Sequence, residues 1–132
     1  MKPIERMFEM NNLMKQSTLC GQTITMELRW IGADCSVLCY GGDKPHIGAA
    51  ALGVPYETPQ GGLSATTSLL SVEKHREGTL CGELAQKLAK HLKCVVCVQC
   101  GIHYDNADQT TIKAVVQAVN ALGDELLTEL GK

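Results

Sequence analysis

The chain has 132 residues and a formal net charge of −2 at pH 7. This length suits one domain with a core of its own and is too short for two. Because 12 Lys and Arg residues are dispersed among 14 Asp and Glu residues, no basic surface that would hold a nucleic acid is expected.

No apolar run approaches the roughly 20 residues that a membrane-spanning helix needs. Residues 1–15 carry charges where a signal peptide has its apolar stretch. The seven cysteines are odd in number and lie mostly in apolar or helical stretches, which argues against a disulfide framework. We therefore expect a cytoplasmic protein with reduced thiols and no membrane partner.

Residues 1–20 form an N-terminal segment of uncertain structure, and residues 21–132 are expected to fold as a single α/β domain. In that domain, residues 22–31 alternate between apolar and polar side chains, which is typical of a half-buried strand. A turn at residues 32–34 leads into residues 35–40, whose nearly continuous apolar character favours a central strand.

Residues 47–54 are small and apolar and end at Pro55, which indicates a third strand against which another element packs closely. Residues 64–72 have the length and the β-branched content of a fourth strand. From Thr79 the apolar period becomes that of a helix, with a leucine at every fourth position as far as Leu92.

A fifth strand is expected over residues 94–100, and a final helix runs from the candidate N-cap Asp108 to Gly131. Three or four strands in a meander, a helix, a strand and a long helix imply an α+β fold in two layers. The sheet would be mixed but mostly antiparallel, with helices on one face. Because three strands are apolar on both sides, a second copy is expected to cover the other face in a two-fold homodimer.

Cys94, Cys97 and Cys100 have a spacing that invites a metal or iron–sulfur interpretation. On a strand, however, Cys97 points to the opposite face from the other two, so that no single ion reaches all three. A structural role is favoured, because free Cys is among the most buried residue types. The chain also contains no GxGxxG after a strand, GxxxxGK[ST], HExxH or GxSxG fingerprint.

Three of the four histidines lie in polar loops between expected elements, each within a few residues of a carboxylate. They are His46 in GGDKPHIG, His75 in EKHREG and His103 in GIHYDN. If these loops converge at one edge of the sheet, two chemistries are open. In the first, the three imidazoles and Asp105 hold a divalent metal with an open position, as in a small metal-dependent hydrolase.

In the second, the loops bind an anion such as a phosphate. The imidazoles, Lys44 and Arg76 would act as donors, together with backbone amides that Gly41 and Gly42 allow to point inward. Asp43 is expected to orient Lys44 or the loop amides and not to contact the phosphate. That the three loops are unrelated and simply solvated remains a further alternative.

Three stretches, GGDKPHIGAAAL, HRE before a leucine-rich helix and GIHYDNAD before the last helix, resemble the prenylated-flavin chaperones associated with UbiD-type decarboxylases. The gallate decarboxylase accessory subunit is one of these proteins. The resemblance covers about residues 22–131. It implies a dimer whose fold is similar to the proteasome assembly chaperones. It also implies a non-enzymatic protein that binds reduced prenylated FMN and passes it to an apo-decarboxylase of the UbiD type.

Position by position, the family's GG-D-[KR]-PHIG pattern falls on residues 41–48 and its G-[LI]-H-x-D-N pattern on residues 101–106. In the middle motif, this chain has Arg76 where a Lys is expected. From the chemistry of these motifs we expect a cofactor site with no catalytic or metal-binding residue, formed by Gly41, Gly42, Asp43, Lys44, His46, His75, Arg76, His103 and Asp105.

In this interpretation the polar loops hold the phosphate and the ribityl chain of the flavin, and the small residues of GAAALG form an apolar floor for its ring. Two other functions stay open. One is the metal-dependent hydrolase that uses His46, His75, His103 and Asp105. The other is a structural subunit of a decarboxylase, which would have no affinity for a small molecule.

Overall fold

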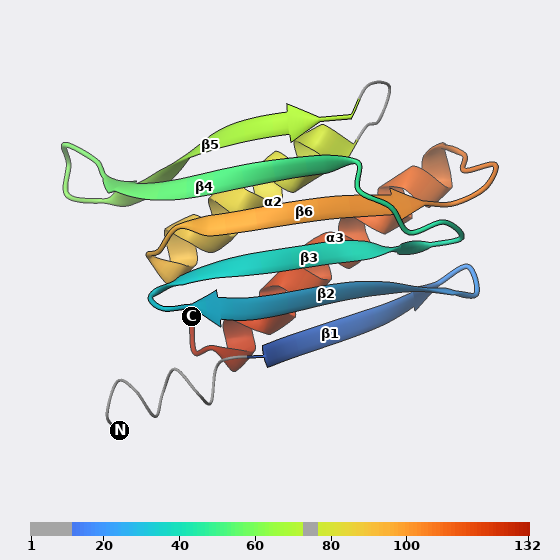
Figure 1. Ribbon diagram of the computed structural model, residues 1–132, viewed down its shortest axis with the longest axis horizontal. Helices are drawn as coiled ribbons and strands as arrows, with labels where there is room; N and C mark the ends of the chain where they lie inside the picture. The colour runs from blue at the N-terminus through green and yellow to red at the C-terminus, as the bar shows by residue number, and fades with distance from the viewer. Residues whose placement is uncertain (1–11, 73–76) are drawn as a thin grey trace.

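The structure is a computed structural model that describes residues 12–72 and 77–132. In these residues, six strands form one mixed sheet, and two helices lie on the same face of it (Figure 1). The predicted α+β class, with a mostly antiparallel sheet and helices on one face, is therefore confirmed. None of the described helices is long and apolar enough to cross a membrane.

The elements follow one another in the order β1 (Asn12–Leu19), β2 (Gln22–Ile31), β3 (Asp34–Gly42), β4 (Ala49–Glu57), β5 (Leu63–Ser71), α2 (Glu77–Leu92), β6 (Val96–His103) and α3 (Gln109–Glu129). Each strand and helix expected after residue 21 is present. Strand β1 was not predicted. It pairs antiparallel with β2 over its whole length and extends the sheet by one edge strand.

The predicted meander is wrong beyond β3. The order in the sheet is β1-β2-β3-β6-β4-β5, so β6 lies between β3 and β4. Strand β6 runs parallel to β3 and antiparallel to β4. Its side chains are buried or half-buried along most of its length, which suits a central position. The chain between β3 and β4 must consequently cross the end of β6 (Figure 1).

Strand β4 does not end at Pro55, as the sequence indicated, but continues to Glu57. Pro55 pairs with Ala65 of β5 on one side. On the other side, β6 accompanies β4 only from Ala49 to Gly53. Pro55 therefore lies where β4 has a free edge, which is where a sheet tolerates a residue without a backbone N–H.

The core lies between the sheet and the two helices. Its largest fully buried side chains include Ile24, Met26, Leu28, Val37, Val96, Val98, Leu84, Leu88, Val119, Leu122 and Leu126. Helix α2 packs against β4, whose helix-facing residues are small. A Cβ at Gly53 would overlap with the carbonyl oxygen of Ala85 in α2. The expected close packing against this strand is confirmed.

The other face of the sheet, which we call the open face, is not covered by any described helix (Figure 1). Side chains that alternate with the core residues point to it, because successive residues of a strand face opposite sides. Several of them are large, apolar and exposed: Leu38, Leu52, Val54 and Leu70. On β6, Cys97 is half-buried on this face and Cys100 is buried on the core face, as expected from their spacing.

Two glycine substitutions should change stability in opposite directions. Gly53→Ala should lower the free energy of unfolding by roughly 1–3 kcal/mol, because the added methyl group displaces α2. Gly82→Ala, within α2, should raise it by roughly 0.5–1 kcal/mol, because nothing lies near the added Cβ and alanine is the better helix former. Urea unfolding followed by circular dichroism measures both values, and equal midpoints for Gly53→Ala and wild type would contradict the close packing.

Candidate functional site

The segment of residues 43–48 crosses the carboxyl end of β6 and is held there by backbone hydrogen bonds. The amide of Asp43 donates to His103 O at 2.7 Å, and the amide of Gly48 donates to Cys100 O at 2.9 Å. The amides of Lys44 and His46 donate to the carbonyl oxygens of His103 and Gly101. These amides are therefore not available to an anion, contrary to the expectation for a glycine-rich cradle.

The glycines of the motif instead permit the crossing. Gly42 has a φ of +81°, and a Cβ there would overlap with the carbonyl oxygen of His103. A Cβ at Gly101 would overlap with the carbonyl oxygen of His46. Gly41 is equally crowded against Thr23 in β2. Only glycine allows two backbones to approach so closely, and the motif brings the loops after β3 and β6 into contact.

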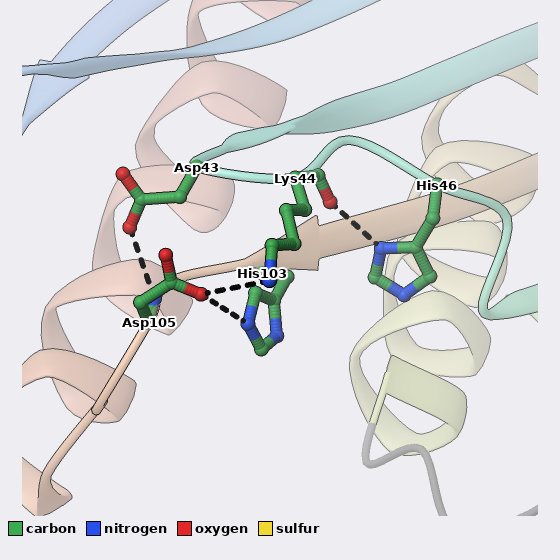
Figure 2. A network of polar contacts seen from close by, with 5 residues as sticks. All are labelled: Asp43, Lys44, His46, His103 and Asp105. Carbon is green, nitrogen blue, oxygen red and sulfur yellow. Dashed lines mark hydrogen bonds and ion pairs between the residues drawn. The ribbon is translucent and has the colours of Figure 1, made fainter.

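Four polar residues of the two loops form one network, which we call the loop cluster: Asp43, Lys44, His103 and Asp105 (Figure 2). Asp105 is at its centre. Its Oδ1 accepts a hydrogen bond from His103 Nε2 at 3.0 Å and lies 3.4 Å from Lys44 Nζ. Its backbone amide donates to Asp43 Oδ2 at 2.9 Å. Asp43 thus binds a loop amide, as expected, although the amide belongs to the second loop.

The loop cluster is open to solvent. The side chain of Lys44 is 72% exposed and that of Asp105 is 51% exposed. The hydrogen bond from His103 and, after it, the ammonium group of Lys44 lower the pKa of Asp105 below its ordinary value. Asp105 is consequently ionised near neutral pH, and its carboxylate occupies both side-chain donors of the cluster, Lys44 and His103. A ligand anion would have to take the place of this carboxylate.

His46 lies to one side of the loop cluster (Figure 2). Its Nδ1 donates to the carbonyl oxygen of Lys44 at 3.1 Å, and its ring lines a hollow of about 310 Å³ on the open face. Over residues 12–72 and 77–132, no group of three His, Cys, Asp or Glu side chains could hold a metal ion. The remaining predicted residues, His75 and Arg76, lie outside the described residues.

An apolar hollow of about 340 Å³ adjoins the loop cluster on the helix side of the sheet. Its lining comes from the start of α2, the end of β6, the following loop and the start of α3: Leu80, Ile102, His103, Tyr104, Asn106, Ala107, Ile112 and Val115. His103 belongs to both the hollow and the loop cluster. One end of the molecule therefore offers the ammonium group of Lys44 and the imidazole of His103 beside an apolar recess.

This hollow was not predicted from the sequence. Of the expected apolar floor in β4, Ala49 and Ala51 are only 2% exposed beneath the helix layer, whereas Ala50 and Leu52 lie on the open face, away from this hollow. In the sequence, Ile112 and Val115 belong to the apolar residues at helical spacing in the last helix, an apolar stripe that does not separate core positions from the wall of a hollow. The signal that could have found them is that this stripe runs to the first turn of the helix, beside the GIHYDN loop.

The loop between β6 and α3 is fixed at both ends. Tyr104 OH donates to Leu19 O at 2.9 Å, which ties the loop to the end of β1. Asp108 is the N-cap of α3, as predicted, and its side chain accepts from Thr111 N at 2.8 Å. Asn106 between them adopts a left-handed φ of +55°, which asparagine tolerates well. His103 and Asp105 are thereby held beside the hollow.

The pKa of Asp105 should respond to the loss of either partner. In His103→Ala the NMR titration midpoint of the Asp105 carboxyl should rise toward the ordinary value, and in Lys44→Ala it should rise by a smaller step. Because the folded-state pKa is lowered, these contacts stabilise the fold above the unfolded-state pKa. The stabilisation is lost as the pH falls through the folded-state pKa. Unchanged midpoints in both variants would contradict the network.

Comparison with known proteins identifies the family and a structure of similar fold. The family described as prenylated flavin chaperone LpdD-like domain matches residues 18–131. No curated protein matches the sequence. Among solved structures, the chain is similar to one from a chaperone complex for yeast 20S proteasome assembly, with a TM-score of 0.55 and 11% sequence identity over 89% of this chain and 97% of that chain. This second likeness shows the fold alone. Because the family match spans nearly all of the described residues, the chain belongs to the LpdD-like prenylated flavin chaperone family.

Proposed function

We propose that this protein is a cytoplasmic, non-enzymatic carrier that binds reduced prenylated FMN and delivers it to an apo-decarboxylase of the UbiD type. The observation that carries the proposal is that His103 belongs both to the loop cluster and to the lining of the apolar hollow, so that the two adjoin. A flavin nucleotide has a phosphate, a polar ribityl chain and a large apolar ring, so its carrier needs charged donors beside an apolar recess.

In this proposal the phosphate of the flavin binds Lys44 and His103 and displaces the carboxylate of Asp105 from them. The phosphate and the carboxylate both present anionic oxygens to Lys44 and His103. Charge-assisted hydrogen bonds to a phosphate are at least as favourable as those to a carboxylate. The pair between Lys44 and Asp105 is exposed, and exposed ion pairs contribute little to stability. Its replacement therefore costs little, and the returning carboxylate helps the cargo to leave.

A carrier must release its cargo as well as bind it, and affinity among related complexes is set mostly by the rate of dissociation. The loop cluster lies on the surface and not at the bottom of an enclosed cavity, in keeping with rapid exchange. Carriage requires no covalent bond and no proton transfer, so His103 acts here as a hydrogen-bond donor. A metal-dependent hydrolase has less support, because the described residues contain no metal-binding group.

Two substitutions in the loop cluster should change affinity in opposite directions. Lys44→Ala should weaken binding of reduced prenylated FMN about tenfold, since one charge-assisted contact is lost, and a factor of ten corresponds to about 1.4 kcal/mol. Asp105→Asn should strengthen binding severalfold, because it removes the competing carboxylate while keeping the size of the side chain. Anaerobic titration followed by absorbance or fluorescence gives both dissociation constants.

Lys90→Ala is the matched control, since Lys90 is exposed near the other end of α2. It should leave the affinity unchanged. Ordinary FMN in both redox states tests selectivity. Delivery is measured by mixing the loaded protein with an apo-decarboxylase of the UbiD type and following the appearance of activity, which should be slower from Asp105→Asn than from wild type. A wild-type protein that binds no flavin, or that binds but never transfers it, would refute the proposal.

We also propose that the open face joins two copies in a homodimer. The pairing register places Leu38, Gln99, Ala50 and Leu70 in one row across β3, β6, β4 and β5. Leu70, at the edge of that row, is 78% exposed. Apart from Gln99 this row is apolar, and it lies on the face that carries no described helix, which favours an interaction surface. A two-fold axis matches a patch of this kind with itself.

Leu70→Glu should shift the protein from dimer to monomer, because it would put a charge into the proposed interface at its most exposed apolar side chain. Sedimentation velocity over a range of concentrations measures the association. Gln117→Glu, on the exposed side of α3, is the control and should leave the association unchanged. A monomeric wild type, or a Leu70→Glu dimer of undiminished affinity, would rule out this surface.

A further inference from the structure

We infer that the apolar hollow is the subsite that distinguishes the prenylated flavin ring from the ring of ordinary FMN, with Ile112 and Val115 of α3 as its specificity-determining residues. This inference rests on the proposed function, because it assigns one end of the same cargo to a defined part of the site. The loop cluster would take the phosphate end, and the hollow would take the ring end.

The first half of α3 carries apolar side chains that the core leaves partly uncovered. The buried residues of this helix begin at Val119 and continue through its second half. Ile112 and Val115 precede them on the helix and are only half-buried. Both line the hollow. Apolar surface left open beside a polar site is what a ligand with an apolar part would cover.

The hollow is preformed by the way in which the helices meet. Helices α2 and α3 come together at Leu84 and Gly123, where a Cβ on the glycine would lie 3.2 Å from the leucine Cδ1. The hollow lies on the N-terminal side of this contact, between Leu80 of α2 and the first turns of α3. Its floor is firm, because Leu80 and Ile102 are buried in the core cluster.

Size and lining indicate which part of the cargo enters. Ligand pockets are commonly about 300–1,000 Å³ in volume, so the 340 Å³ hollow suits a ring system and not a whole nucleotide. Five of its lining side chains are aliphatic, whereas a ribityl chain or a phosphate would need several donors. Two polar side chains also line the hollow. His103, at the end of β6, belongs to the loop cluster as well, and Asn106 follows the cluster residue Asp105 in the chain.

Prenylation adds an isoprenoid-derived ring to the flavin and so enlarges its apolar surface. In a hydrophobic pocket, one methylene group changes binding by about 10- to 200-fold. A hollow lined by Leu80, Ile102, Ile112 and Val115 would therefore favour the prenylated ring over the ordinary one. The loop cluster cannot make this distinction, because both flavins carry the same phosphate.

The experiment compares reduced prenylated FMN with reduced FMN in anaerobic titrations of three proteins. Val115→Phe fills the hollow from a half-buried position and should weaken binding of the prenylated form at least tenfold, with a smaller effect on FMN. The selectivity ratio should fall accordingly. Gln117→Phe places the same side chain on the exposed side of the same helix and should leave both affinities unchanged. Circular dichroism and thermal unfolding establish that each variant is folded.

Val115→Thr provides a second variant of nearly unchanged volume if Val115→Phe does not fold. It puts a hydroxyl group into the hollow and should also lower the selectivity ratio. Unchanged affinity and selectivity in a folded Val115 variant would overturn the subsite assignment and leave the proposed function intact. A wild-type protein that binds neither flavin would overturn the proposed function itself, so that the two failures are distinguishable.

Discussion

The connection between β3 and β4 has to cross the carboxyl end of β6, because β6 lies between these strands in the sheet. The other features of the candidate site depend on this constraint. In the crossing, the amides of Asp43, Lys44, His46 and Gly48 donate to carbonyl oxygens of β6. The crossing also requires glycine where the backbones meet, at Gly42 and Gly101. It also brings Asp43 and Lys44 against the loop that carries His103 and Asp105.

The resulting site combines exposed ion pairs, which contribute little binding energy each, with an apolar hollow whose lining is held in place by the core. Its charged groups are exposed and already paired, so each contact contributes little by itself and can be exchanged. The recess beside them is built from side chains that the core holds in place. This division suits a carrier, in which shape and apolar area confer selectivity while the charges orient the cargo and let it go.

Short-range patterns were sufficient to predict much of the fold. Alternation identified β2, and the capping residue Asp108 located the start of α3, because both signals are contained in a few neighbouring residues. Strand β1 was not predicted, because it has few apolar side chains and its residues alternate only between exposed and half-buried. The place of β6 and the existence of the hollow could not be predicted, since each depends on contacts between segments distant in the sequence. For the same reason, the pattern of Ile112 could not distinguish a core position from the wall of a recess.

The parallel pairing of β3 with β6 joins parts of the chain that are far apart: Asp43 and Asp105, linked in the loop cluster, are 62 positions apart. Contacts of such separation form late, since loop closure must precede them. On the proposed function, a newly made chain could hold a flavin at this site only after β6 has been synthesised and has entered the sheet. A ligand that binds the native state and not the unfolded state raises the protein's free energy of unfolding by mass action. Loaded and empty carriers would then differ in lifetime, and the supply of cofactor would set how much carrier persists.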